Sequence, residues 1–207
     1  MDEISTNLRS LKMPGMAHFW QTLQETRRHD ELSLKDGLQM MIQAELDNRT
    51  MSRNARLLKR ARFRYQASVD QLIFDPARGL DRQTVLNLAT CDYIRHGVAV
   101  IITGAAGTGK SWLASALGHQ ACMNGLKVLD SQQLLDFMEI IEDRHGKKAT
   151  IIVSQLPVSD WYDILQKNTT AADAILDRLV HTAVRIELKG DSMRRKKTGK
   201  ENADKEK

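Results

Sequence analysis

The stretch that decides the fold reads Gly104-Ala105-Ala106-Gly107-Thr108-Gly109-Lys110-Ser111. It matches the P-loop pattern G-x-x-x-x-G-K-[ST] at every specified position. The segment before it, Val98–Thr103, is apolar on both faces, which is typical of a buried parallel strand. The segment after it predicts a helix from Trp112 to about Asn124, which Gly125 ends. Because a P-loop requires this order of strand, loop and helix, the sequence predicts an α/β domain with a phosphate-binding loop.

The residue types of this loop suit the binding of phosphate. Its glycines permit backbone angles that a side chain would forbid, so successive N–H groups can form an anion nest at the positive end of a helix. Lys110 can reach the β- and γ-phosphates of a nucleotide, and the Ser111 hydroxyl can ligate Mg²⁺. We therefore expect ATP and Mg²⁺ as cofactors; the alternative is a glycine-rich turn that binds nothing. The expected nucleotide-binding residues are Gly104, Ala105, Ala106, Gly107, Thr108, Gly109, Lys110, Ser111 and Trp112.

Composition limits the class of protein. The 207 residues carry a net charge of +5, a modest basic excess that favours nucleic acid or another anionic partner. The two cysteines, Cys91 and Cys122, stand outside any CxxC pattern, so neither a disulfide framework nor a zinc site is expected. No apolar run approaches the ~20 residues of a membrane span, and the acidic start lacks the apolar core of a secretory signal. We expect a cytoplasmic protein without a membrane partner.

Breaker residues divide the chain into three parts. The cluster from Asp75 to Asp81 separates a helical, basic N-terminal domain, 1–75, from the P-loop domain, 76–190. Within the second part, further strands are expected at Ala149–Ser154 and Val184–Leu188 and further helices at about 82–94, 131–144 and 171–182. Residues 191–207 are rich in lysine and predict a basic disordered tail.

The N-terminal part shows two patterns of helical spacing. Apolar residues recur every three to five positions and predict a buried stripe, at Leu38, Met41, Ile42, Leu46 and Met51. A basic helix through Ala55–Ala67 then offers phosphate contacts to DNA, through Arg53, Arg56, Lys59, Arg60, Arg62 and Arg64, supplemented by Arg194–Lys197 and Lys200. The alternatives for these cations are a solvated face or a surface that docks a partner protein.

One part of an ATP-hydrolysing P-loop protein is missing from the sequence. Hydrolysis uses acidic residues at the end of an apolar strand, which hold Mg²⁺ and help to activate water. No such strand follows Ser111: Val128–Asp130 is short, and the acids from Glu139 to Asp143 fall on a predicted helix. The residues present therefore support nucleotide binding and do not support efficient hydrolysis, so the sequence alone leaves enzymatic activity open.

Several stretches outside the P-loop carry a family resemblance. They are Leu8–Met16, Arg53–Arg64, Arg78–Arg82, Leu113–His119, Thr150–Pro157 with Trp161, Asp173–Leu179 and Arg185–Gly190. Together with the P-loop they resemble the IstB-like ATP-binding proteins, transposition helpers of insertion sequences that are similar to DnaC-type helicase loaders. The resemblance covers nearly all of the chain.

The resemblance implies an AAA+ ATPase that assembles as a homo-oligomer on DNA and regulates a transposase. It implies catalytic roles for Lys110 at the nucleotide, for Ser154 as a sensor of the γ-phosphate, and for Arg178 as a sensor or an arginine finger. An ordinary solvent-facing helix arginine is the alternative for Arg178. The expected function is thus an ATP-binding accessory protein of DNA transposition. A replicative helicase loader, a small-molecule kinase and an inactive remnant of a mobile element remain as alternatives.

The chain departs from the family pattern near Val128–Asp130. There the resemblance implies a further βα unit, on the order of 30 residues, that contains the acidic Walker B strand. The expected fold is therefore an α/β, AAA+ type parallel sheet reduced to about three strands, with an all-helical N-terminal domain. In the family order 5-1-4-3-2, the three remaining strands would sit as 5-1-4. Ala149–Ser154 would then form an apolar edge, which invites pairing with another chain and lowers stability.

Overall fold

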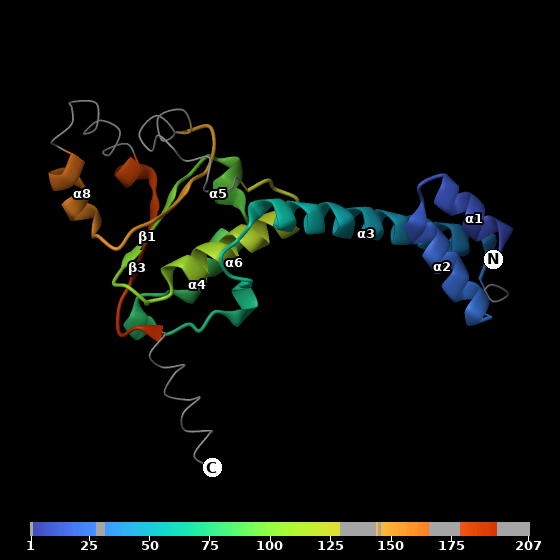
Figure 1. Cartoon of the computed structure of the whole chain (residues 1–207), viewed down its shortest axis with the longest axis horizontal. Helices are drawn as coiled ribbons and strands as arrows, with labels where there is room; N and C mark the ends of the chain where they lie inside the picture. Colours follow the sequence, from blue (N-terminus) through green and yellow to red (C-terminus); the bar gives the residue numbers. More distant parts are fainter. Residues whose placement is uncertain (1, 28–31, 129–143, 145, 166–178, 194–207) are drawn as a thin grey trace, which may run out of the picture. The chain divides into compact units, whose positions relative to one another are not determined.

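The chain folds as two compact units, Met1–Lys59 and Arg60–Lys207. The computed structural model in Figure 1 describes residues 2–27, 32–128, 144, 146–165 and 179–193. The division falls inside helix α3 (Leu34–Ala61), ahead of the breaker cluster at which the sequence placed the boundary. The reason is that residues after α3 pack on the second unit: Phe63 lies against Gly118, and Phe74 joins the core of that unit.

In the first unit, α1 (Glu3–Ser10) packs on α2 (Pro14–Glu25), and α2 begins against α3. A Cβ atom on Gly15 would lie 2.5 Å from the carbonyl oxygen of Ala44, so only glycine allows this approach. The carboxylate of Glu45 accepts from the backbone N–H of Gly15 at 2.8 Å and from that of Met16 at 3.3 Å. A buried glutamate of α3 thus satisfies N–H groups at the start of α2.

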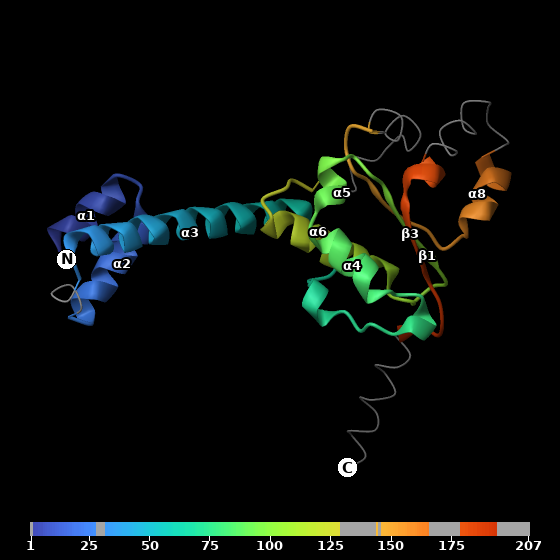
Figure 2. The same cartoon turned by 180° about the vertical axis from the view of Figure 1, so that it is seen from behind.

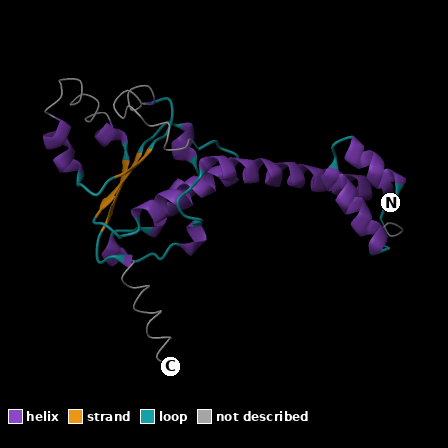
Figure 3. Ribbon diagram, in the orientation of Figure 1, coloured by secondary structure: helices purple, strands orange, loops and turns teal. Residues whose placement is uncertain are grey.

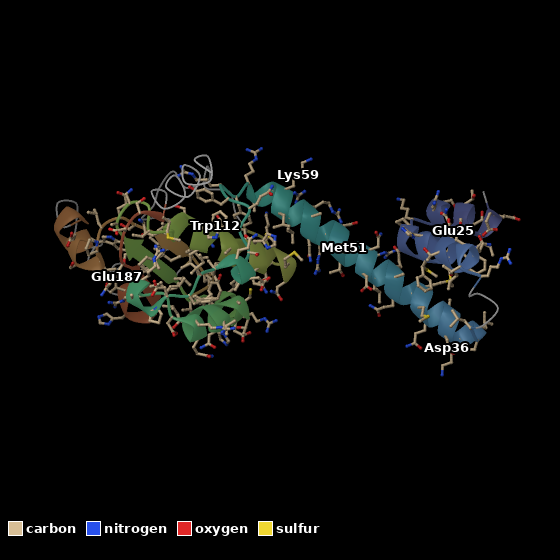
Figure 4. All side chains as sticks on the ribbon, turned by 90° about the horizontal axis from the view of Figure 1, so that it is seen from below. Glu25, Asp36, Met51, Lys59, Trp112 and Glu187 are labelled. Carbon is tan, nitrogen blue, oxygen red and sulfur yellow. The ribbon has the colours of Figure 1, made fainter. Side chains whose placement is uncertain are left out.

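The buried apolar stripe predicted on α3 is wrong for four of its five residues. Leu38, Ile42 and Leu46 are about half exposed, and Met51, labelled in Figure 4, is 72% exposed; Met41 alone is partly buried. The buried residue in this stretch is Glu45, where α2 meets the helix. Helical spacing predicted the element correctly, but in the described part of the chain nothing covers this face.

The second unit contains a three-stranded parallel sheet, drawn in orange in Figure 3. Its strands are β1 (Val100–Gly104), β2 (Ile151–Val153) and β3 (Val184–Leu188), in the order β2-β1-β3. Val100 pairs with Ile151 on one side and with Val184 on the other. Since these are the three strands expected from the sequence, the arrangement 5-1-4 is confirmed. β2 stands at one end of this order, and Val153 is 40% exposed.

Helices cover both faces of β1, as Figures 1 and 2 show. Val100 and Ile102 point to a core shared with α4 (Arg82–Ala89) and α6 (Lys110–Met123). Ile101 points to the opposite core, where it packs with Ile152, with Leu179 and with Trp161 of α8 (Val158–Leu165). All three β1 residues are fully buried, which agrees with the apolar character of both faces of the predicted strand.

Two predicted helices end earlier than their patterns suggested. α3 ends at Ala61 rather than Ala67, because Arg62 has a φ of 46°. The helix expected over 82–94 is broken into α4 and α5 (Asp92–Arg95) by Cys91, with a φ of 65°. Short 3₁₀ turns, η2 (Val69–Gln71) and η3 (Pro76–Arg78), connect α3 to α4.

Other expectations fall partly or wholly beyond the described residues. The helix expected at 131–144 and most of that at 171–182 lie outside them, although residues 179–182 are helical. The tail 191–207 is described only as far as Met193. Within the described ranges, no helix combines the length and the apolar character that crossing a membrane would require.

Candidate nucleotide-binding site

The P-loop lies at the carboxyl end of β1 and leads directly into α6. Its three glycines have positive φ angles: 139° at Gly104, 85° at Gly107 and 100° at Gly109. Close neighbours also require two of them. A Cβ atom on Gly104 would lie 2.1 Å from the carbonyl oxygen of Leu188, and one on Gly107 would lie 2.1 Å from Ser192 Oγ. The glycine pattern that identified the loop is therefore explained by both backbone conformation and packing.

The third glycine borders open space. No atom lies within 4 Å of a Cβ built on Gly109, which is the N-cap of the 14-residue helix α6. The first N–H groups of a helix have no intrahelical acceptor, and the helix dipole adds partial positive charge there. The open space at Gly109 is thus next to the position where an anion is most favourable.

Lys110 is a buried cation, only 7% exposed. Its Nζ atom donates to the carbonyl oxygens of Gly104 and Ala105, both at 2.7 Å. Burial lowers the pKa of its ammonium group. Among the described residues no carboxylate forms an ion pair with it. Since a buried charge is costly without a counter-charge, the residue is suited to an anionic ligand.

The remaining loop residues divide into structural and exposed ones. Thr108 is buried, and its hydroxyl donates to the carbonyl oxygen of Ala105 at 2.9 Å, which closes the turn. Ala105 and Ala106 are exposed, and Ser111 is partly exposed. In the described ranges no cluster of three His, Cys, Asp or Glu side chains could hold a metal ion. The Ser111 hydroxyl is the group here that fits the magnesium role expected from the sequence.

Trp112, labelled in Figure 4, is the third residue of α6 and is partly buried. Its ring lies 5.6 Å from the ring of Tyr65, tilted by 47°. The Arg64 guanidinium lies 5.5 Å from the centre of the same tyrosine ring. Trp112 therefore follows the P-loop as predicted, but its ring also packs against the segment that succeeds α3.

Ser154 follows β2 and lies beside the end of β1. Its backbone N–H donates to the carbonyl oxygen of Ile102 at 3.0 Å. Its hydroxyl accepts from the indole Nε1 of Trp161 at 3.2 Å and from the backbone N–H of Leu156 at 3.1 Å. The structure brings Ser154 and the P-loop to the same edge of the sheet, with the serine hydroxyl bonded to its own turn. Arg178, the other predicted sensor, lies outside the described residues.

Two residues that the sequence analysis did not assign contact the P-loop. Arg78 Nη2 donates to the carbonyl oxygen of Thr108 at 2.9 Å. The backbone N–H of Met193 donates to the carbonyl oxygen of Gly107, also at 2.9 Å. Arg78 belongs to a stretch that carried the family resemblance, so that signal could have identified it. Nothing in the sequence around Met193 points to this contact.

The basic residues predicted to contact DNA are exposed. Arg53, Arg56 and Lys59 belong to the first unit, and Arg60, Arg62 and Arg64 belong to the second. The Arg56 side chain donates to the carbonyl oxygen of Ser52 one turn earlier. No acidic residue occurs between positions 48 and 64, so this stretch has uniformly positive charge.

Comparison with known proteins identifies the family. The model of the IstB-like ATP-binding proteins matches residues 6–134 and 128–201. An insertion sequence ATP-binding protein of Sinorhizobium fredii is 35% identical, with 91% of this chain and 94% of that protein covered. The ATP-binding protein of insertion sequence IS21 from Pseudomonas aeruginosa is 28% identical, with 97% and 91% covered. A crystal structure of DnaI aligns at 15% identity and a TM-score of 0.43, with 66% and 92% covered.

The alignments also contain positions that this chain lacks. The Sinorhizobium alignment runs over 231 positions but takes in 91% of 207 residues, about 188, so 231 minus 188 leaves about 43 positions without a residue here. The two matches of the family model meet at residues 128–134. The family match and the relatives extend over most of the chain on both sides of that junction, and the chain therefore belongs to the IstB-like ATP-binding protein family.

Proposed function

We propose that this chain binds ATP with Mg²⁺ at its P-loop and acts as an accessory protein of DNA transposition, in company with a transposase. The observation that carries the proposal is Lys110, a buried cation that has carbonyl partners and sits beside the open helix start at Gly109. The names of the relatives, ATP-binding proteins of insertion sequences, support the transposition context.

Each P-loop group would have a definite role toward ATP. The backbone N–H groups from Gly107 to Lys110 would donate to the β-phosphate oxygens, as in other anion nests. The Lys110 ammonium would exchange its two carbonyl acceptors for β- and γ-phosphate oxygens. The Ser111 hydroxyl would ligate the bound Mg²⁺, which neutralises charge between the two phosphates.

We propose further that hydrolysis is slow. The support is the absence of an apolar strand ending in acids from the sequence after Ser111, together with about 43 relative positions that have no residue in this chain. The two family matches that meet at 128–134 give the location at which such a unit would be missing. Without an acidic strand, the site can hold the phosphates but has lost a group that activates water.

ATP binding is tested by titrating the full chain with fluorescent ATP in the presence of Mg²⁺. Lys110→Ala should weaken binding at least on the order of a hundredfold, because a charge-assisted contact to two phosphates is lost. Lys127→Ala removes the same charge from an exposed residue at the other end of the α6 region and should leave binding unchanged. Equal binding by the wild type and Lys110→Ala would refute nucleotide capture by this P-loop.

DNA contact is proposed for the exposed cations at the end of α3. Reversing the charges of Arg56, Lys59 and Arg60 to glutamate should abolish retention of duplex DNA at low salt, because phosphate contacts supply non-specific affinity. Wild-type retention should fall steeply with salt and show little dependence on sequence. Retention is measured by gel shift on one duplex over a series of salt concentrations.

The matched control applies the same change in net charge to other exposed cations. Charge reversal at Lys35, Arg82 and Lys127 also removes six units of positive charge but leaves the 53–64 stretch intact. This control should retain DNA nearly as well as the wild type. If both triple variants lose DNA equally, overall charge rather than the α3 cations would account for binding.

A further inference from the structure

The P-loop is held from its outer side by groups that come from two distant parts of the chain. The Arg78 guanidinium donates to the carbonyl oxygen of Thr108, and the Met193 N–H donates to the carbonyl oxygen of Gly107, both at 2.9 Å. The Arg78 guanidinium also contacts the Met193 sulfur atom. Two consecutive carbonyls of the loop therefore have partners that themselves touch each other.

Arg78 is fixed on the end of β3 rather than on a free linker. Its carbonyl oxygen accepts from the backbone N–H of Lys189 at 2.9 Å. The next residue, Gly79, has a φ of 73°, and a Cβ atom there would lie 2.2 Å from the carbonyl oxygen of Glu187. Asp75 caps the η3 turn before it, since its carboxylate accepts from the Ala77 N–H at 3.0 Å. The sheet thus determines where the guanidinium sits.

The planarity of the peptide bond connects these contacts to the phosphate nest. In a trans peptide the C=O of one residue and the N–H of the next point in opposite directions. A partner on the Gly107 carbonyl therefore orients the Thr108 N–H, and a partner on the Thr108 carbonyl orients the Gly109 N–H. Gly109 is the residue that borders open space at the start of α6. The Thr108 N–H meets the Ala105 carbonyl oxygen at 3.4 Å within the loop, so it is the Arg78 contact on the Thr108 carbonyl that orients an N–H group, that of Gly109, beside the open space.

The charge of Arg78 is also not balanced within the described residues. Its guanidinium contacts a carbonyl oxygen and a thioether sulfur, and among the described residues no carboxylate forms an ion pair with it. Arg78 and Lys110 both donate to carbonyl oxygens of the P-loop, so both cations increase the positive potential of the loop toward an anion.

We propose that Arg78 and Met193 are positioning residues that brace the P-loop in its phosphate-binding conformation before nucleotide arrives. The brace, defined as these two residues, holds the turn in which the Thr108 N–H meets the Ala105 carbonyl and preorganises the Gly109 N–H for phosphate, so that less ordering is needed on binding. Its effect on nucleotide affinity rests on the proposed ATP binding. Its effect on the conformation of the nucleotide-free loop is independent of that proposal.

The first test uses the full chain without nucleotide. Arg78→Met should speed amide hydrogen exchange in residues 104–110 by about tenfold, because the loop opens more often once a bond to a charged donor is lost. Arg82→Met is the matched control: it removes the same charge four residues away, where the guanidinium lies 5.9 Å from the Phe74 ring centre. Met193→Pro, which lacks the N–H donor, should act like Arg78→Met, and Met193→Ala, which keeps it, should not.

Exchange in the interior of α6 should stay unchanged in the same samples, which separates a local brace from general destabilisation. The proposal is overturned if P-loop exchange in both Arg78→Met and Met193→Pro stays within twofold of their controls. Should Arg78→Met fail to fold, the comparison of Met193→Pro with Met193→Ala decides the question alone.

The second test measures affinity for fluorescent ATP and ADP. Both should weaken by about the same factor in Arg78→Met, on the order of tenfold, because both nucleotides place a β-phosphate in the nest. Weakening of ATP alone would mean that Arg78 contacts the γ-phosphate directly and would overturn the positioning role. If the wild type binds neither nucleotide, the proposed function fails, while the exchange experiment still decides whether the brace exists.

Discussion

Strand β1 and helix α3 both carry apolar residues at the periodicity of their secondary structure. Those of β1 are buried, whereas those of α3 are largely exposed. Val100, Ile101 and Ile102 are fully buried, since strands pair with both edges of β1 and helices cover both of its faces. Leu38 and Leu46 of α3 are about half exposed, whereas the contacts of α2 with α3 seen here lie around Glu45. Hydrophobic periodicity therefore predicts whether a segment is a strand or a helix, whereas its burial depends on which other segments pack against it.

In their buried charges, by contrast, the two units are alike. The P-loop unit buries the cation Lys110 against carbonyl oxygens, and the first unit buries the carboxylate Glu45 against N–H groups. Both charged groups sit where backbone dipoles of the matching sign converge at a helix start or loop. The cations at the end of α3 are exposed instead, and Arg56 donates to a carbonyl oxygen of its own helix. Lys110 and Glu45 are thus buried against backbone groups that they pair with, rather than against apolar side chains.

The largest expected effect separates the two apolar regions. Leu117→Ala, at a fully buried position of α6, should lower the free energy of unfolding of the second unit by about 2–5 kcal/mol. Leu46→Ala, on the exposed face of α3, should change that of the first unit by about 0.5 kcal/mol or less. Native-state hydrogen exchange measures each effect on amides of its own unit. Similar losses at the two positions would show that α3 is covered in solution.

An intermediate effect is expected for two helical glycines of the first unit. Gly15→Ala should destabilise the contact of α2 with α3 by about 1–3 kcal/mol, because the new Cβ atom would meet backbone atoms of Ala44 and Glu45 within 3 Å. Gly37→Ala is the matched control, since no atom lies within 4 Å there, and it should stabilise α3 by about 0.5–1 kcal/mol. Protection of the α2 amides against hydrogen exchange measures the effect of Gly15→Ala. A gain in that protection would contradict the close packing of α2 on α3.

The smallest effect concerns the buried carboxylate. Burial raises the pKa of Glu45, but hydrogen bonds from Arg49 and from the N–H groups of Gly15 and Met16 outweigh it, so the pKa is lowered overall. A lowered pKa in the folded state adds stability above the ordinary pKa of a glutamate, and this stability is lost as pH falls through the lowered value.

Glu45→Gln should therefore lower the free energy of unfolding of the first unit by about 1 kcal/mol at neutral pH. In the variant, the protection of α1 and α2 amides against hydrogen exchange should fall less steeply below about pH 4.5 than in the wild type. Exchange rates corrected for intrinsic pH dependence would measure it. An unchanged acid profile in the variant would mean that another carboxylate controls this contact.

Local patterns predicted much of the second unit. The P-loop, the strand before it and the helix after it follow from one octapeptide and its flanks, and α6 begins at Lys110, only two residues before the predicted start. Val184–Leu188 was predicted as a strand with the bounds that β3 has. The order β2-β1-β3 came from the family resemblance, because local pattern alone does not place strands side by side.

Long-range contacts were not predictable in this way. Arg78 meets Thr108 thirty residues later, and Met193 meets Gly107, although neither pair shares a local pattern. Likewise, nothing in the spacing of α3 indicated that Leu38 and Leu46 are about half exposed. The left-handed conformation of Cys91, which splits the helix expected over 82–94, is set by packing, since cysteine has no intrinsic preference for it.

The most direct test of the account is a count of intact ATP bound per chain in the presence of Mg²⁺, with phosphate release followed in the same samples. We expect about one ATP per wild-type chain, hardly hydrolysed over the measurement, and loss of that ATP in Lys110→Ala but not in Lys127→Ala. Absence of bound ATP in the wild type, or undiminished binding in Lys110→Ala, would contradict it.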